Sequence, residues 1–469
     1  MANGEKLMKD TMLYGVANFG SKIIMFLMLP LYTHYFTPAE YGLWDLVVTT
    51  ATLLAPFITF ELVSAVYRWL LEENETENKK SIITTGAVTI FRNLIIFNLL
   101  AIVVFLIVSI PFGWLALIYI NATVFSSFIQ QCARGLGFNK LFALIGIIQT
   151  VIMVAFILLF IFVFAFRIEA FFYASIIAAM AVIIYAWKAM QFSQYIALSA
   201  YSKTRLKSFL VYSIPIIPGA ASWWVMTMSD RYFITIYLGM DANGIYAVAN
   251  KIPAILLMIN TVFLLAWKDS AILEFDSKDK NDYYSNVFRH FFRLMATTVI
   301  CLTLITKPVL AVMIADTFYS AWKYIGILLL GTLFNACALF WAAGYHGAKR
   351  TNIIFITSVI GALVNVLFNV VFIKTIGLYA VVISTFTAFL VTWLIRVFSA
   401  KHYFVIKIHY QDMVILSLLM IIAIIIPFIF NQVGLAVSIC LSIFLFIWYN
   451  WKLLKLIWHH FATYRVKPK

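Results

Sequence analysis

Residues 29–45 read LPLYTHYFTPAEYGLWD, and this stretch decides the fold. The Thr37-Pro38 pair ends a hydrophobic helix, because proline cannot continue a helix and disfavours helical backbone in the residue before it. Gly42 and Trp44 then open a second apolar run, with an aromatic side chain where a membrane interface favours one. The stretch therefore predicts the outer turn of a helical hairpin whose two helices cross a membrane.

The same pattern returns 202 residues further along the chain. Tyr35 and Gly42 lie seven residues apart, and so do Tyr237 and Gly244. A third copy of the glycine-aromatic part begins at Gly377. Related halves are a common feature of secondary transporters. The repeat therefore predicts two pseudo-symmetric halves.

The composition excludes a soluble globular protein. Of the 469 residues, 64% are hydrophobic and 11% are charged, whereas an ordinary domain carries about 25% charged residues. Apolar runs of about 18 residues or more recur along the chain, and each is long enough to cross a bilayer core of about 30 Å. The strands of a membrane barrel would instead alternate polar and apolar residues. We therefore expect an all-α polytopic membrane protein.

These apolar runs predict about fourteen membrane-spanning helices. They cover residues 12–36, 42–66, 82–109, 112–133, 141–166, 170–190, 208–236, 244–267, 290–314, 325–346, 352–374, 377–398, 412–430 and 433–454. The spans divide into a six-helix lobe over 1–201, a six-helix lobe over 202–408, and two further helices with a basic tail over 409–469. Pro215 and Pro218 are expected to kink the seventh span, which is tolerated where the break packs in protein or lines a wet cavity.

The net charge of +15 follows the positive-inside rule and does not indicate a nucleic-acid partner. With the N-terminus in the cytoplasm, most of the 34 Lys and Arg residues fall in internal loops and tails, and the C-terminus is cytoplasmic as well. External loops are then very short, so none is expected to form a catalytic domain. The four cysteines lie in hydrophobic spans and the seven histidines lack metal-ligand spacing. Neither a disulfide framework nor a metal or other cofactor is expected.

Three segments resemble bacterial polysaccharide-unit flippases of the MOP exporter superfamily. They are LPLYTHYFTPAEYGLWDL at 29–46, ARGLG at 133–137 and SDRYFITIYLGMDANGIYAVANKIP at 229–253. The resemblance covers about residues 8 to 400. It implies two lobes around a central cavity whose opening alternates between the two sides of the membrane. It also implies a flippase that moves undecaprenyl-pyrophosphate-linked oligosaccharide from the cytoplasmic to the periplasmic leaflet of the inner membrane, for O-antigen or a similar surface polysaccharide.

The resemblance also implies the partners. These are the lipid-linked oligosaccharide, the membrane lipids and, as a further candidate, the machinery that polymerises the units. No nucleic acid is expected. Coupling to H⁺ or Na⁺ stays open, and so do the identity of the oligosaccharide and the oligomeric state.

Four basic residues are candidates for binding the pyrophosphate. Lys22 and Arg92 lie deep in the first and third predicted spans, and Lys251 lies nearer the outer end of the eighth. Charges inside a membrane are expensive and indicate function, although each of these residues is also able to snorkel or to pair with a carboxylate. Arg134 lies at the inner mouth of the fourth span, where it meets either substrate phosphate or anionic headgroups.

Four further charged residues are candidates for ion coupling or gating. Asp45, Glu61 and Asp230 are carboxylates inside predicted spans, and a buried carboxylate whose pKa is shifted is able to bind and release a proton. Asp230 and Arg231 are adjacent, and because neighbouring helical residues do not face each other, we expect a separate partner for each. The asparagines at 365 and 369 share a helix face and predict interhelical hydrogen bonds.

Two other classes of protein remain as alternatives. An ion-coupled multidrug exporter of the same superfamily has the same two lobes, but it typically has twelve spans and an acidic cavity. A membrane glycosyltransferase or O-antigen polymerase usually carries a substantial external loop, which this sequence lacks. No nucleotide-binding loop of the GxxxxGK[ST] type occurs. We expect a transporter rather than an enzyme.

Overall fold

The computed structural model describes residues 20–430 and 432–465, and within them it contains helices and no strand. The helices are α2 (Leu29–Tyr35), α3 (Pro38–Thr59), α4 (Leu62–Glu72), α5 (Thr76–Ile107), α6 (Gly113–Gly135), α7 (Asn139–Phe162), α8 (Glu169–Ala189), α9 (Lys203–Ser213), α10 (Ile217–Met228), α11 (Asp230–Leu238), α12 (Met240–Ala249), α13 (Lys251–Leu273), α14 (Lys280–Met313), α15 (Trp322–Gly347), α16 (Thr351–Ile376), α17 (Leu378–Ala400), α18 (Tyr410–Ile429) and α19 (Gln432–Arg465).

Thirteen helical segments of the described chain are long and apolar enough to cross a membrane. Each coincides with one predicted span from the second to the fourteenth, which confirms the all-α polytopic class. The first predicted span, 12–36, lies partly outside the described residues. Within them, the chain is helical over 20–27 and again in α2.

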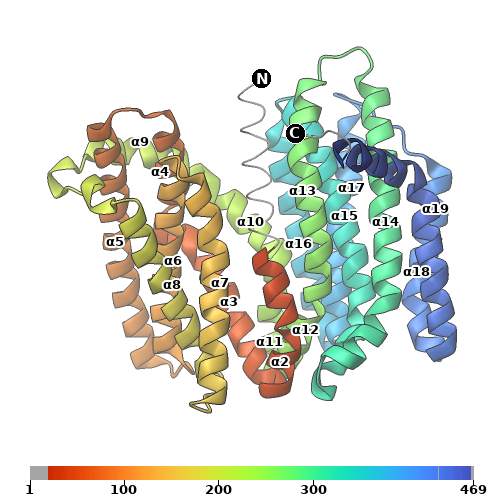
Figure 1. Cartoon of the computed structure of the whole chain (residues 1–469), viewed down its shortest axis with the longest axis horizontal. Coiled ribbons are helices and arrows are strands. Elements are labelled where there is room, and N and C mark those ends of the chain that lie inside the picture. The colour runs from red at the N-terminus through yellow and green to blue at the C-terminus, as the bar shows by residue number, and fades with distance from the viewer. Residues whose placement is uncertain (1–19, 431, 466–469) are drawn as a thin grey trace. The chain divides into compact units, whose positions relative to one another are not determined.

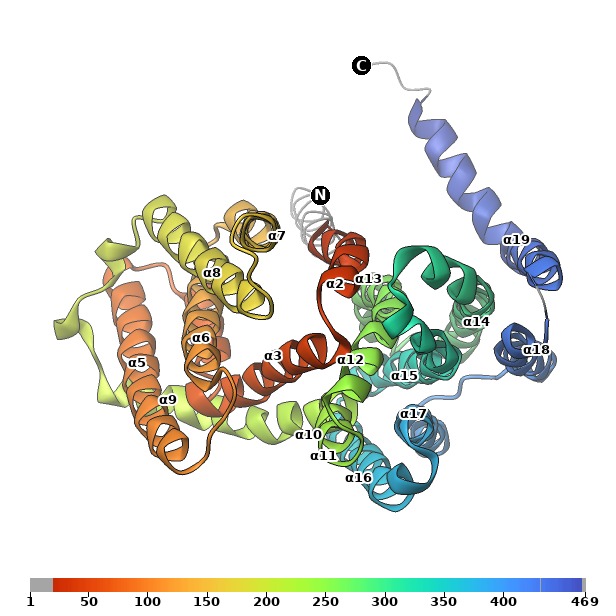
Figure 2. The ribbon, with the colours of Figure 1, turned by 90° about the horizontal axis from the view of Figure 1, so that it is seen from below.

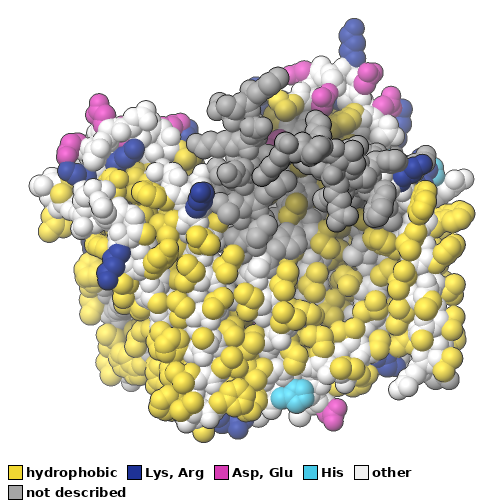
Figure 3. Space-filling view, viewed as in Figure 1, with side chains coloured by type: hydrophobic (Ala, Val, Ile, Leu, Met, Phe, Trp, Pro, Cys, Tyr) yellow, Lys and Arg dark blue, Asp and Glu magenta, His cyan; other side chains and the backbone are white. Residues whose placement is uncertain are grey.

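The described surface is apolar where a bilayer would surround it. On the face in Figure 3, hydrophobic side chains form a broad band, and most of the charged side chains lie near the upper edge of that face. Leu106 and Ile107 of α5 are 80% and 78% exposed. Large apolar side chains exposed side by side are unfavourable in water, so lipid is the solvent that this surface fits.

The predicted hairpin turn is present between α2 and α3. The Thr37 hydroxyl accepts a hydrogen bond from the Glu40 backbone N–H at 3.3 Å, and the Glu40 carboxylate accepts one from the Thr37 N–H at 2.8 Å. This reciprocal capping satisfies helix-end donors, and Pro38 at the first helical position needs no hydrogen-bond acceptor there. The corresponding helix of the second half, α12, begins at Met240, again 202 residues further on.

The structure divides into two compact units, Met1–Trp224 and Val225–Lys469. The sequence places the lobe boundary earlier, between residues 201 and 202. The difference arises because the segment that follows α8 docks on the first unit. Phe209 is fully buried and packs its ring against Trp69 of α4, with centroids 5.1 Å apart. The Thr84 hydroxyl of α5 donates to the Tyr195 carbonyl at 3.2 Å.

In the first unit, α6 is the central helix, in contact with α3, α4, α5, α7 and α8 (Figure 1). Its end carries the ARGLG segment, and Gly135 allows close packing there, because a Cβ atom at this position would lie 2.8 Å from Leu70 Cβ of α4. The expected kink of the seventh span is a short 3₁₀ turn, Ile214–Ile216, between α9 and α10. The unit thus holds α6 tightly against α4.

In the second unit, α15 has the central position, among α13, α14, α16 and α17 (Figure 2). The two additional helices, α18 and α19, pack against α14. Asp412 of α18 accepts hydrogen bonds from Arg289 at 2.9 Å and from Arg293 at 2.8 and 2.9 Å, both on α14. This charge-assisted cluster fixes α18 to the unit.

Candidate functional site

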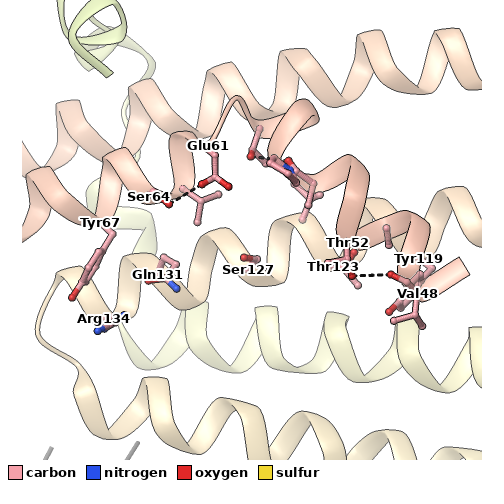
Figure 4. A pocket seen from close by; sticks show the side chains of 16 residues that line it. Val48, Thr52, Glu61, Ser64, Tyr67, Tyr119, Thr123, Ser127, Gln131 and Arg134 are labelled. Carbon is pink, nitrogen blue, oxygen red and sulfur yellow. Dashed lines mark hydrogen bonds between the residues drawn. The ribbon is translucent and has the colours of Figure 1, made fainter. Parts of the chain in front are cut away.

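A cavity of about 560 Å³, half open to its surroundings, is formed in the first unit by α3, α4 and α6 (Figure 4). Most of its lining residues carry polar groups, although the helices around it are largely apolar. The polar lining consists of Thr52, Thr59, Glu61, Ser64, Tyr67, Tyr119, Thr123, Ser127, Gln131 and Arg134. All of these residues belong to one unit, so the cavity is defined within it.

One wall of the cavity is a polar stripe along α6. Thr123, Ser127, Gln131 and Arg134 are spaced by four, four and three residues, which puts them on one helix face. Figure 4 shows them one after another along α6, opposite residues of α3 and α4. The adjacent position Phe128 is buried in the hydrophobic core. We call these four residues the α6 stripe.

The opposite wall contains a break in the second predicted span, 42–66. Phe60 and Glu61 have φ angles of 50° and 54°, so two consecutive non-glycine residues adopt left-handed backbone between α3 and α4. Each such residue costs about 1–2 kcal/mol. Pro56 prepares the break, since it lacks the N–H that the Thr52 carbonyl would receive in a regular helix. Strain of this kind is retained mainly at functional sites.

Neighbouring hydrogen bonds hold the break in place. Asn93 of α5 is buried, and its side-chain amide donates to the Ile58 carbonyl at 3.0 Å. The Glu61 Oε2 atom accepts a hydrogen bond from the Ser64 hydroxyl at 2.8 Å. Arg68, further along α4, forms an ion pair with Glu72. The Glu61 carboxylate is therefore held at the cavity wall.

Replacing Asn93 by alanine is expected to lower the free energy of unfolding by about 1 kcal/mol, because the variant loses a buried hydrogen bond to the strained segment. Unfolding of the purified protein in detergent measures this change. Asn74→Ala, at an exposed loop position, is the matched control and is expected to leave stability unchanged. Equal stability of both variants would contradict a clamping role for Asn93.

Arg134 lies in the last turn of α6, at the end of the cavity that also holds Tyr67. Its guanidinium carbon is 4.5 Å from the Tyr67 ring centroid and 5.5 Å from that of Phe142. Cations are favourable near a helix C-terminus, and contacts with aromatic faces add to this. The side chain is half-buried, so it keeps access to the cavity.

A second polar cluster lies in the second unit, around Asp230. The carboxylate is buried and accepts hydrogen bonds from Tyr246 at 2.8 Å, Thr385 at 2.7 Å, Asn365 at 3.2 Å and Asn369 at 2.9 Å. These side chains come from α12, α16 and α17, whereas Asp230 begins α11. The interhelical hydrogen bonds predicted for the two asparagines are confirmed. Four donors thus converge on one intramembrane carboxylate.

Arg231 and Asp230 share a contact with Tyr246. Arg231 is buried, and its guanidinium donates to the Thr227 carbonyl at 3.2 Å and lies 5.4 Å from the Tyr246 ring centroid. Tyr246 therefore contacts both charged side chains, through its hydroxyl and its ring respectively.

Four other predicted site residues lie elsewhere in the described chain. Lys22 is exposed in the helical stretch at 20–27, and Arg92 is exposed on α5. Asp45 is half-buried on α3, and Lys251 is half-buried at the start of α13. None of these four is among the described residues that line the cavity. Their roles in binding or coupling stay predictions.

Sequence reasoning missed Arg396 of α17, which is 3% exposed. Its guanidinium donates to the Ala338 carbonyl at 2.8 Å and to the Thr357 hydroxyl at 2.9 Å. It also donates to the Ser358 hydroxyl at 3.1 Å and the Ile354 carbonyl at 3.2 Å. The position near the inner end of a span gives no sign of this burial. Thr123 and Ser127 of the α6 stripe were missed as well, although their four-residue spacing is visible in the sequence.

The fold is that found in transporters of the MOP superfamily. The structure "Lipid II flippase MurJ, inward closed conformation" matches with a TM-score of 0.70 and 16% identity, over 95% of this chain and 100% of that chain. An inward-facing multidrug resistance MATE family transporter matches with a TM-score of 0.61 and 15% identity, over 87% of this chain and 95% of that chain. A MOP superfamily transporter from Pyrococcus furiosus matches with a TM-score of 0.56 and 14% identity, over 87% of this chain and 95% of that chain.

Sequence comparison places the chain in a family. The family model for polysaccharide biosynthesis proteins matches residues 7–267, more than half of the chain. The chain therefore belongs to the polysaccharide biosynthesis protein family. No curated protein matches the chain.

Proposed function

We propose that this protein is a flippase for undecaprenyl-pyrophosphate-linked oligosaccharide repeat units. It moves them from the cytoplasmic to the periplasmic leaflet of the bacterial inner membrane by alternating access, for O-antigen or a similar surface polysaccharide. Both termini lie in the cytoplasm, and the protein does no chemistry on its substrate. The family membership supports this proposal, and so does the fold shared with a protein described as a lipid II flippase.

The observation that carries the proposal is the polar cavity inside an otherwise apolar helical unit. A sugar headgroup cannot cross hydrocarbon unaided, because each polar group without a hydrogen bond costs about 2–7 kcal/mol. Hydroxyl, amide and charged side chains replace the lost water. The prenyl chain needs no such cavity and remains in lipid.

Within this proposal, Arg134 binds the pyrophosphate at the cavity end. A guanidinium offers several N–H donors in a geometry that suits phosphate oxygens. Lys22, Arg92 and Lys251 are proposed as further cations along the path. A polysaccharide polymerase is a candidate partner that receives the translocated units.

Replacing Arg134 by alanine is expected to slow translocation by about ten- to a hundredfold, because a hydrogen bond to a charged group contributes about 1.5–3 kcal/mol. The rate is measured with lipid-linked repeat units in liposomes that contain the purified protein. Arg68→Ala is the matched control, because Arg68 is exposed, lies outside the cavity lining and pairs with Glu72. Equal rates for the two variants would remove Arg134 from the substrate path.

Ion coupling is proposed at Asp230. The carboxylate is buried within a membrane-spanning unit and accepts hydrogen bonds from four neutral donors, so a proton or cation would bind there by displacing one of them. Each elementary charge moved across 100 mV supplies about 2.3 kcal/mol. Glu61 and Asp45 are the alternative coupling groups, and Arg231 is proposed to gate the Asp230 cluster through Tyr246.

Deleting the gene tests the function directly. The flippase proposal expects loss of surface polymer, with lipid-linked units trapped in the cytoplasmic leaflet. Intact polymer together with raised drug sensitivity would instead favour a multidrug exporter. Units that reach the outer leaflet and stay unpolymerised would favour a polymerase.

A further inference from the structure

We propose that the cavity of the first unit is a saccharide subsite, in which the three neutral residues of the α6 stripe, Thr123, Ser127 and Gln131, and the Glu61 carboxylate recognise neutral hydroxyl-bearing sugars of the headgroup. The inference rests on the proposed flippase function and deepens it. It assigns recognition of the sugars, as distinct from the pyrophosphate, to particular side chains.

The chemistry of the lining fits sugar hydroxyls better than a multiply charged anion. A sugar hydroxyl both donates and accepts hydrogen bonds, and so do the side chains of Ser127 and Gln131. The Thr123 hydroxyl donates to the Ile120 carbonyl at 2.9 Å and is left as an acceptor. Among the described residues that line the cavity, Arg134 is the one cation, and it lies at one end. A site built for pyrophosphate along its length would need several cations. The neutral residues of the α6 stripe therefore form a hydrogen-bonding wall that continues beyond the end of the cavity occupied by Arg134.

The break before α4 supplies an acceptor to this wall. On a continuous helix, Thr59 and Glu61 would point about 200° apart, since successive residues turn by about 100°. Both nevertheless line the cavity. The left-handed backbone at Phe60 and Glu61 turns the Glu61 side chain toward the cavity. The strained backbone therefore has a specific consequence, which is the position of this carboxylate. A carboxylate offers about four acceptor positions, so the bond from Ser64 leaves capacity for sugar hydroxyls.

The same carboxylate selects among sugars. A uronic acid placed beside Glu61 would bring two negative charges close together, and this repulsion is unfavourable. Neutral and amino sugars avoid this repulsion. A cavity of about 560 Å³ falls in the range of about 300–1,000 Å³ usual for small-ligand sites, which suits a short part of an oligosaccharide.

The test compares two neighbouring pairs of substitutions on α6. Ser127→Ala with Gln131→Ala removes two groups of the stripe. Ser126→Ala with Gln130→Ala removes the same residue types one position earlier, where Gln130 donates to Ser126 at 3.0 Å and neither residue lines the cavity. Glu61→Gln is a third variant, which keeps the size of the side chain and removes its charge.

Two probes separate the sugar from the lipid pyrophosphate: undecaprenyl pyrophosphate that carries the host's repeat unit, and undecaprenyl pyrophosphate without sugar. Dissociation constants are measured in nanodiscs by tryptophan fluorescence. Wild type is expected to bind the glycosylated lipid about tenfold tighter than the bare lipid. The S127A/Q131A pair is expected to lose most of this preference with unchanged affinity for the bare lipid. The S126A/Q130A pair is expected to keep the preference, and Glu61→Gln to reduce it.

Three results would overturn the inference. The first is that the wild type binds both lipids with equal affinity. The second is that the S127A/Q131A pair weakens binding of both lipids equally. The third is that S127A/Q131A and Glu61→Gln both keep the wild-type preference for the glycosylated lipid. Translocation by the wild type in liposomes is measured alongside. If the wild type translocates the lipid and one of these three results is found, the flippase function is supported and the saccharide subsite is rejected. Absence of translocation removes the flippase function and the subsite together.

Discussion

Replacing Asp230 by alanine is expected to abolish translocation and to lower the free energy of unfolding by about 2–4 kcal/mol. Four buried donors from Tyr246, Thr385, Asn365 and Asn369 converge on this carboxylate. In the variant the Tyr246 hydroxyl loses its acceptor, whereas the other three donors keep one each: the Val381 carbonyl for Thr385, the Ser384 hydroxyl for Asn365 and the Asn365 side-chain oxygen for Asn369. Because donors in membrane proteins find substitutes more readily than donors in soluble proteins, the expected total stays below four full desolvation penalties.

The measurement combines unfolding in detergent with translocation in liposomes under an imposed ion gradient. Asp241→Ala, an exposed carboxylate in the first turn of α12, is the control and is expected to retain stability and transport. Asp230→Asn distinguishes coupling from structure, since a folded variant that still binds substrate is expected to lose its response to the gradient. A response equal to wild type would remove Asp230 as the coupling group.

Replacing Arg396 by leucine is expected to lower the free energy of unfolding by about 2–4 kcal/mol. The guanidinium joins three helices, because Arg396 is on α17 and its acceptors are on α15 and α16. Leucine removes the charged donor that these buried acceptors share and supplies none in its place. Such a loss is expected to reduce the amount of folded protein in cells before any effect on transport appears.

Two further variants make this prediction specific. Arg396→Lys keeps the charge but not the planar fork, so we expect a loss of stability between wild type and Arg396→Leu. Arg68→Leu alters an exposed arginine paired with Glu72, and surface pairs contribute at most about 1 kcal/mol. If Arg396→Leu were no more harmful than Arg68→Leu, the buried network would have little role in stability.

Much of the fold follows from local patterns in the sequence. Apolar runs predict the spans, and the Thr37-Pro38 pair predicts the hairpin turn, because hydropathy and proline geometry act within a few residues. The break at Phe60 and Glu61 is different. Neither residue favours left-handed backbone, so contacts from other helices, such as Asn93 with Ile58, must specify it.

The candidate site is also harder to predict than the spans. A hydroxyl residue in a membrane helix can bond its own backbone, as Thr52 does with the Val48 carbonyl at 2.8 Å, so residue type alone does not show which face meets a cavity. Arg134 and Glu61 were predicted because charge stands out inside a span. Ser127 and Thr123 became candidates only when α6 was seen opposite the broken helix. Arg396 was missed because the sequence does not reveal its acceptors, which lie on two other helices.

The docked segment after α8 also bears on how the protein is made. Phe209 completes the packing around Trp69, yet it lies beyond all six helices that the sequence assigns to the first lobe. During synthesis the N-terminal part emerges first, but its core stays open until the ribosome has released residue 209. Nascent chains that stop at residue 201 would leave an aromatic surface uncovered, where chaperones or proteases can engage it.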